Sequence, residues 1–192
     1  MASLSNPDFK AVVKTHSGSY EYDLRASNVI TDLTISDDPD SLAKEANLTV
    51  FNLSKDGKTL ATRIQPNDRL YVYGNIGSGN FEIFRGVIWE NDRMSDTEKH
   101  VTFTAYDYLI FAMKSEDYFY YKKGLSTKEI IKRICSKWNL KIKYSYGSIK
   151  NKRIKPVQKS IGDMLVYVLN KAKSKLSKRY ILTIEGTTVV VK

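Results

Sequence analysis

Few residues of this chain have the types and spacing that metal or catalytic chemistry requires. The turn "SDDPD" brings Asp37, Asp38 and Asp40 together, and carboxylates are the preferred ligands of divalent cations. A calcium loop also needs a central glycine and further ligands at fixed positions, and this turn lacks both. We therefore interpret the turn as solvated and expect no metal ion and no cofactor.

The candidate nucleophile and imidazole groups are equally isolated. His16 and His100 are far apart in the sequence and form no H-x-x-x-H pair of the kind that binds zinc. Cys135, the single cysteine, lies on the apolar stripe of a predicted helix, so we interpret it as a core residue of a protein from a reducing compartment. The glycines of "GNIGSGNF" precede a strand and indicate a hairpin turn, not a phosphate loop. We expect no catalytic residue and no enzyme activity.

The elements of residues 1–113 are predicted to be antiparallel strands. Apolar and polar side chains alternate in "EANLTVFN" and "HVTFTAY", and about seven such segments are separated by turn signals. Many short strands favour a small barrel or sandwich, because closing a sheet removes its exposed edges. Gly86, inside a strand, predicts a bulge or a bend at a barrel corner.

Residues 114–192 change to a helical period. Ser126 and Glu129 have the spacing of a capping box, and Ser160 with Asp163 predicts the start of a second helix. A strand in "KIKYSY" and a closing hairpin around "EGTT" complete a predicted α+β module.

A short apolar helix is predicted where the two modules meet. Residues 108–113 are apolar around the whole helix, which predicts burial on all sides, including Tyr108, Leu109 and Phe111. Asp107 is suited to be its N-cap. We expect this junction to fix one module to the other.

Charge divides the chain in the same way. Residues 1–117 carry 12 Lys and Arg against 18 Asp and Glu, whereas residues 118–192 carry 19 against 3. The basic segment "SIKNKRIKPVQK", with Tyr144 and Tyr146 before it, keeps a nucleic-acid-binding module open as the alternative function. The acidic first half argues against specific nucleic-acid binding, and we interpret the tyrosines of "EDYFYYKKG" as packing between the modules. The sequence shows neither a signal peptide nor a membrane-spanning stretch, which predicts a soluble protein made without export.

The order of several segments resembles a known family. These segments are "FRGVI", "HVTFTAYDYLIFAMKSEDYFYYKKGLSTKEIIKRICSKWNL", "KPVQKSIGDMLVYVLNKA" and "YILTIEGTTVVV". Together they resemble the baseplate hub protein of contractile phage tails, and more narrowly the XkdQ-type hub of defective prophages and tailocins. The resemblance runs from Phe9 to Lys192, and its most telling parts are "TAYDYL", residues 104–109, and "IIKRIC".

The resemblance implies a non-enzymatic scaffold. Hubs of this family contain a β-barrel similar to the tail-tube fold, and three copies form a ring that joins the tail tube to the central spike. The resemblance therefore implies a homotrimer whose partners are the tail tube protein, the central spike protein and other baseplate proteins. It also implies assembly in the bacterial cytoplasm into the baseplate of a phage virion or tailocin. Family members are usually longer and carry a second barrel, so we expect this chain to be a shortened form.

Overall fold

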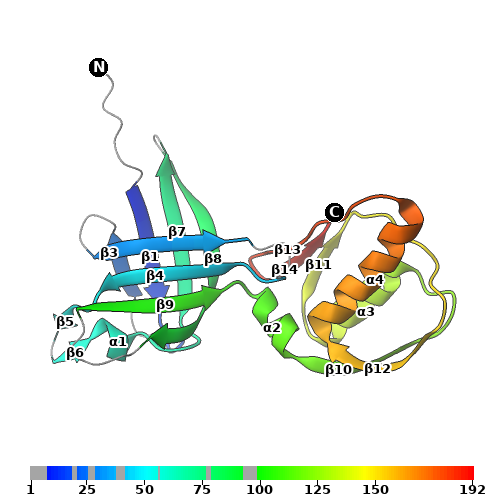
Figure 1. Cartoon of the computed structure of the whole chain (residues 1–192), viewed down its shortest axis with the longest axis horizontal. Coiled ribbons are helices and arrows are strands. Elements are labelled where there is room, and N and C mark those ends of the chain that lie inside the picture. The colour runs from blue at the N-terminus through cyan, green and yellow to red at the C-terminus, as the bar shows by residue number, and fades with distance from the viewer. Residues whose placement is uncertain are drawn as a thin grey trace, which may run out of the picture. The chain divides into compact units, whose positions relative to one another are not determined.

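The structure, a computed structural model, forms two compact units. It describes residues 8–18, 21–25, 29–37, 42–55, 57–76, 79–92 and 99–192. Unit 1 comprises Met1–Asp38 and Lys44–Asp107, and unit 2 comprises Pro39–Ala43 and Tyr108–Lys192 (Figure 1). The boundary inferred from the sequence, at residue 113, differs from this division because the short helix after Asp107 belongs to unit 2. Asp38 and Asp40 of the acidic turn lie outside the described residues.

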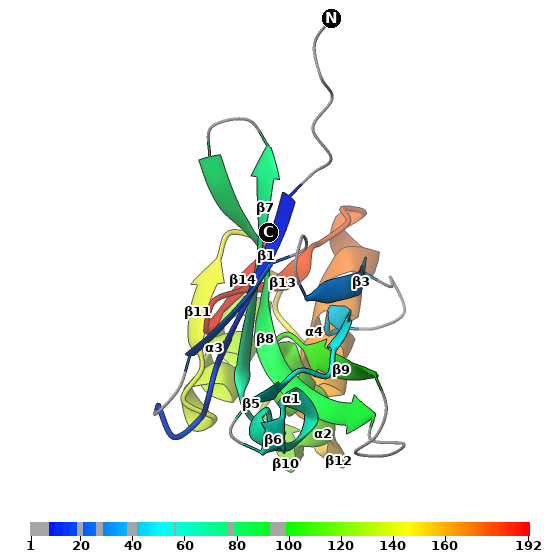
Figure 2. The ribbon, with the colours of Figure 1, turned by 90° about the vertical axis from the view of Figure 1, so that its left-hand side faces the viewer.

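Unit 1 is a seven-stranded antiparallel sheet. Its spatial order is β2 (Glu21–Arg25), β1 (Asp8–Lys14), β7 (Arg69–Ile76), β8 (Gly79–Asp92), β9 (His100–Tyr106), β4 (Glu45–Phe51) and β3 (Ile30–Ser36). The long strand β8 curves along its length (Figure 2). Residues Gly79–Val87 of β8 pair with β7, and the last part, from Val87 to Asp92, pairs with β9.

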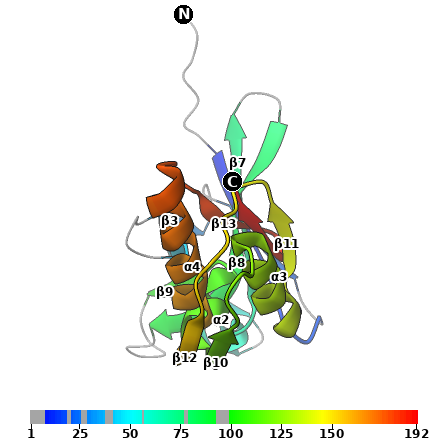
Figure 3. The ribbon, with the colours of Figure 1, turned by 90° about the vertical axis from the view of Figure 1, so that its right-hand side faces the viewer.

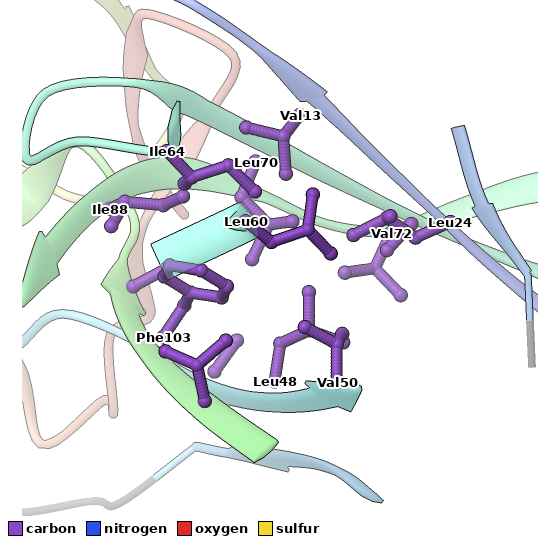
Figure 4. Packing of buried hydrophobic residues seen from close by; sticks show 14 of the residues in the cluster. Val13, Leu24, Leu48, Val50, Leu60, Ile64, Leu70, Val72, Ile88 and Phe103 are labelled. Atoms are coloured by element: carbon purple, nitrogen blue, oxygen red, sulfur yellow. The ribbon is translucent and has the colours of Figure 1, made fainter. Parts of the chain in front are cut away.

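The alternating side chains of these strands build a single core. Leu48 in β4 lies opposite Phe103 in β9, and both are fully buried, whereas Thr49 on the other face bonds the Thr102 hydroxyl at 2.9 Å. Leu24 of edge strand β2 belongs to the same hydrophobic cluster (Figure 4). The sheet therefore curls around one core, as a small barrel does. No hydrogen-bonded ladder joins β2 to β3 among the described residues, so those residues do not show the closed barrel that the sequence suggested.

One short helix contributes to this core from the segment between β4 and β7. It follows a small hairpin of β5 (Ser54–Lys55) and β6 (Lys58–Thr59) and is named α1 (Leu60–Arg63). Leu60 and the following Ile64 are buried in the cluster of Figure 4. The Asn91 amide donates to the carbonyl oxygens of Ala61 and Ile64, each at 3.2 Å, and so holds the end of the helix to β8.

Unit 2 is an α+β arrangement of three helices and two small sheets. In chain order it contains α2 (Leu109–Lys114), β10 (Glu116–Tyr121), α3 (Thr127–Lys137), β11 (Lys141–Tyr144), β12 (Ile154–Ser160), α4 (Ile161–Leu176), β13 (Leu182–Glu185) and β14 (Thr188–Val191). Strands β10 and β12 pair antiparallel, and β11 pairs parallel with β14, which also forms the predicted hairpin with β13. Helices α3 and α4 pack side by side (Figure 3).

Side-chain caps begin both long helices of unit 2. The Glu129 N–H donates to Ser126 Oγ at 3.2 Å, and the Ser126 N–H donates to the Glu129 carboxylate at 2.7 Å, which completes a capping box. The Asp163 N–H donates to Ser160 Oγ at 2.9 Å at the start of α4. These bonds satisfy backbone donors that a helix start leaves free. The buried stripes that follow are Ile130, Ile131, Ile134 and Cys135 in α3 and Met164, Leu165, Val168, Leu169 and Ala172 in α4.

The strand pair β4–β9 continues for one further residue on each strand. The N–H of Asp107 donates to the carbonyl oxygen of Lys44 at 3.0 Å, next to the pair of Glu45 with Tyr106. Lys44 and Asp107 are also the residues at which the chain passes between unit 1 and unit 2. Two of the chain's connections between the units are therefore hydrogen-bonded neighbours within unit 1.

Candidate interaction surface

The residues considered for metal or nucleophilic chemistry are not brought together. His16 donates its backbone N–H to the buried carboxylate of Asp68 at 2.8 Å, and the ring of His100 lies tilted against that of Phe51, with centroids 4.7 Å apart. Asp37 forms an ion pair with Lys44 at 2.6 Å. Within the described part of the chain, no three His, Cys, Asp or Glu side chains are grouped so that they could hold a metal ion.

Cys135 is enclosed by the apolar stripe of α3. Burial raises the pKa of its thiol to about 11, so the thiol stays protonated near neutral pH. A protonated, enclosed thiol is a weak nucleophile.

Gly86 permits a close approach of two strands. A Cβ atom on Gly86 would lie 2.1 Å from the carbonyl oxygen of Tyr106, which is closer than any real contact. Gly86 pairs regularly with Leu70, and the register shifts of β8 occur on either side of it, near Ile83 and Trp89. Gly86 therefore lies where β8 begins to pair with β9, and it is not itself a bulged residue.

The junction helix α2 departs from the sequence-based expectation in two respects. Its N-cap residue is Tyr108 and not Asp107, because Asp107 still belongs to the ladder with Lys44. Leu109 is buried, with 1% of its surface exposed, but Phe111 is 41% exposed. The prediction of burial on all sides is therefore wrong for Phe111, since α2 packs on α4 with one face only.

The most exposed aromatic surface of unit 2 is the ribbon formed by β10 and β12. Tyr118 and Tyr120 alternate with the buried Phe119, so both project from the outer face, with exposed fractions of 71% and 46%. Gln158, the partner of Tyr118 in the ladder, donates to Glu116 on this face at 2.7 Å. Within unit 2 these two side chains cover no core, so the packing of the tyrosines between the modules stays a prediction.

A bulge and a buried amide shape the far end of the ribbon. Lys155 and Pro156 of β12 together face the single residue Tyr120 of β10, which lets a proline enter the strand. Beyond the ladder, Asn151 is buried and donates its side-chain amide to the Thr127 hydroxyl at 3.3 Å and to the Leu125 carbonyl at 3.4 Å. These bonds hold the segment before α3 beside the segment before β12.

A surface pocket of about 330 Å³ lies at this end of the ribbon. It is lined by Tyr120, Tyr121, Lys122, Leu125 and Arg133. The lining comes from the last two residues of β10, from the segment that follows it and from Arg133 of α3, so the pocket lies at the end of β10 beside α3. Burial is the main cause that raises the pKa of Tyr121, and this ring forms an apolar wall.

The surface around the pocket is strongly basic. Residues 118–160 contain 13 Lys and Arg and a single acidic residue, Glu129. Lys122 and Arg133 form no ion pair within 4 Å in the described part of the chain, although the charge of Arg133 acts on Glu129. The nearby carboxylate of Asp117 is already bound, because it pairs with Lys137 at 2.5 Å and accepts from Trp138 Nε1 at 3.2 Å. The hydrogen bond to Lys137 lowers the pKa of Asp117.

Cations of the chain itself lie over three tyrosine rings of unit 2. Arg153 lies 5.4 Å from the centre of the Tyr120 ring, and Lys128 lies 6.0 Å from that of Tyr144. Tyr167 is approached by Lys171 at 4.2 Å and by Lys159 at 6.0 Å. These contacts are attractive because the ring face is negative, and a base that stacks on the same face would have to displace the cation.

The pocket was not predicted from the sequence, although the sequence does indicate which tyrosines are exposed beside it. Alternation in "EDYFYY" places Tyr118 and Tyr120 on one face of a strand and could have predicted their exposure. Arg133 joins them only through the packing of α3 beside β10, which no local pattern encodes. The described residues contain no helix that is both long and apolar enough to cross a membrane.

Comparisons with known proteins place this fold. The tail protein from Neisseria meningitidis MC58 is 12% identical and superposes with a TM-score of 0.65 over 95% of this chain and 50% of that one. The 43 kDa tail protein of prophage MuSo2 from Shewanella oneidensis is also 12% identical, with a TM-score of 0.61 over 96% of this chain and 53% of that one. At this identity the likeness establishes a shared fold, and this chain spans about half the length of each structure.

Comparison with curated protein sequences finds no match. A family model does match, and its match includes all of unit 2 together with residues 44–107 of unit 1. Because residues 39–192 fit the model described as YQBQ-like, which is most of the sequence, the chain belongs to the YQBQ-like family.

Proposed function

We propose that this protein is a structural component of a phage or tailocin tail and that it acts in the baseplate hub, joining the tail tube to the central spike. The observation that carries the proposal is the fold, because nearly the whole chain superposes on two proteins named as tail proteins. The sequence resemblance to baseplate hubs agrees with it. Both units take part in the superposition, so the likeness extends beyond the curled sheet alone.

The proposal includes an assembly. Three copies form a ring in the baseplate, and their partners are the tail tube protein, the central spike protein and other baseplate proteins. Assembly takes place in the bacterial cytoplasm, and the product is the baseplate of a virion or a tailocin. The two tail proteins of similar fold are about twice as long as this chain.

A non-enzymatic role is part of the proposal. Of the described residues, His16 has its ring Nδ1 3.0 Å from the Asp68 carboxylate, and the thiol of Cys135 is buried with a raised pKa. Catalysis would need a nucleophile or base within reach of a substrate pocket. The pocket beside β10 is lined by tyrosines, a leucine and two cations, which suits binding.

Electron microscopy of induced particles tests the hub assignment. A strain with the gene deleted is compared with the same strain complemented by the intact gene. We expect few or no assembled tail tubes without this protein, because the hub is where a tube begins, and restored tails on complementation. Tails of normal length in the deleted strain would overturn the assignment.

Nucleic-acid binding remains the second candidate, and the density of cations in residues 118–160 favours it. Cations of the chain lie near the rings of Tyr120, Tyr144 and Tyr167 and compete with bases for stacking there, so we expect electrostatic contacts to be the main source of affinity. A labelled single-stranded oligonucleotide titrated at two salt concentrations separates the candidates. We expect binding that disappears at physiological salt, whereas sub-micromolar affinity retained there would favour the nucleic-acid function.

A further inference from the structure

We propose that the pocket beside β10 is a docking site for an extended, acidic segment of a partner protein, with one apolar side chain of that segment entering the pocket. This inference rests on the proposed function only in supposing that the partner is a protein.

The lining of the pocket has the two kinds of group that such a segment needs. Tyr121 and Leu125 provide an apolar wall, and Lys122 and Arg133 provide two cations at the same opening. The volume of about 330 Å³ suits one or two side chains and is small for a folded surface. An acidic residue on either side of an apolar anchor would therefore meet both cations.

The position of the pocket favours an extended partner. It lies at the end of β10, and β12 is the only strand that pairs with β10 in the described part of the chain, so the other edge of β10 has no strand partner there. An extended segment along a strand edge places alternate side chains toward the surface, so a single anchor can enter while its neighbours stay outside. Tyr118 and Tyr120, with Arg153 over the second ring, continue the contact surface along the ribbon.

Charge determines the class of segment. With one acidic residue among 13 basic ones in residues 118–160, an approaching cationic or neutral surface gains little, whereas an acidic one is attracted over a wide area. Tyrosine and arginine are also the residues that contribute most often to protein interfaces. The cations near the rings of Tyr120 and Tyr144 favour a protein segment over a stack of bases.

Selection from a displayed library of random decapeptides tests the proposal without a known partner. The purified full chain is the target, at physiological salt. We expect selected peptides to be enriched in Asp and Glu around a single Leu, Phe or Met. Failure to select any peptide, or a selected set without acidic enrichment, would overturn the proposal.

Variants then locate the binding. The selected peptide, labelled with fluorescein, is titrated against the wild type, the double variant Lys122→Gln and Arg133→Gln, and the matched control Lys173→Gln and Lys175→Gln. All four lysine and arginine side chains are exposed, and both double variants remove two charges. We expect about tenfold weaker binding for the pocket variant and a change below about twofold for the control. Equal losses in the two would mean diffuse attraction and would refute a pocket site.

Two further measurements exclude the other occupants. An oligonucleotide of equal charge that competes for the pocket more strongly than the peptide would overturn the choice of a protein segment. Analytical ultracentrifugation of the full chain tests whether a second copy of this protein occupies the pocket. Self-association that the pocket variant abolishes would show that the occupant is another copy and would overturn the choice of a partner protein. These binding experiments use the purified protein alone, whereas the tail assignment is tested by microscopy of particles. Failure of the docking proposal can therefore be distinguished from failure of the proposed function.

Discussion

Gly86 in β8 lies so close to Tyr106 in β9 that an added Cβ would be 2.1 Å from the Tyr106 carbonyl oxygen and 2.7 Å from its carbonyl carbon. Because the obstacle is backbone, a side chain cannot rotate away to relieve it. We expect Gly86→Ala to lower the free energy of unfolding by about 1–3 kcal/mol, measured by chemical denaturation.

Gly74→Ala is the matched control for Gly86, because its nearest contact would be the flexible Phe81 side chain at 3.3 Å. We expect this variant to change the stability by less than about 1 kcal/mol. Equal losses at the two glycines would contradict the close-approach explanation.

The helix α2 provides a second test, in which two large apolar side chains differ in burial. Leu109→Ala removes a buried side chain and should cost about 2–5 kcal/mol, through lost burial and a cavity. Phe111→Ala changes a side chain that is already 41% exposed, so we expect a clearly smaller loss. Thermal unfolding of both variants makes the comparison, and a larger shift for Phe111→Ala would show that the assigned face of α2 is wrong.

Asp68 supports two turns at the same end of the β1–β7 pair, one after β1 and one before β7. Its carboxylate accepts the backbone N–H groups of His16 and Gln65, each at 2.8 Å, and it is only 1% exposed. Asp68→Ala would leave these donors without their partner, so we expect a loss of about 2–4 kcal/mol in denaturation experiments.

His16→Ala distinguishes the backbone hydrogen bond of His16 to Asp68 from the contact of its imidazole ring with the same carboxylate. The variant removes the imidazole, which is 62% exposed, but retains the backbone donor to Asp68. We expect little change in stability. A loss as large as that of Asp68→Ala would mean that the imidazole, and not the backbone, carries the interaction.

Cys135 predicts a pH dependence. Its pKa is raised by burial from 9.0 to about 11, so the folded protein holds the proton more tightly than the unfolded chain does. The protonated thiol therefore contributes its full share of the folding stability below pH 9. This contribution, about 2–3 kcal/mol in the free energy of unfolding, is lost as the pH rises through 11. The measurement is the stability of the wild type against Cys135→Ala at several pH values.

The difference between these two proteins should narrow above pH 9, since only the wild type has the thiol. Other groups titrate in the same range and cancel in the comparison. A difference that stays constant up to pH 11 would be inconsistent with a buried, protonated thiol.

Much of unit 1 and the starts of the long helices could be predicted from local patterns. Strict alternation in β4 and β9 decides which face is buried, and the spacing of Ser126 with Glu129 marks the first turn of α3. These signals are local, because each depends on neighbours within one element. The mainly β first unit and the α+β second unit follow from them.

The ribbon and the pocket could not be predicted in this way. The segment of β12 contains Pro156 and four polar side chains, so it is typical of a loop, and a bulge is what lets it pair with β10. In α2, an all-apolar composition gives no preferred face, and Phe111 is exposed because only one side of the helix packs on α4. Both outcomes depend on partners distant in the sequence.

The hydrogen bond between Asp107 and Lys44 has a mechanical consequence. The chain passes between the units after β3, before β4 and after β9, and these three strands are adjacent and antiparallel, with their connections at the same end. A pulling force applied at these connections along the strand direction would therefore draw all three strands together and would not slide them past one another. Such a force would load the ladder from Val87 to Asp92, which joins β8 to β9, in shear, so that its bonds share the load and do not open one at a time.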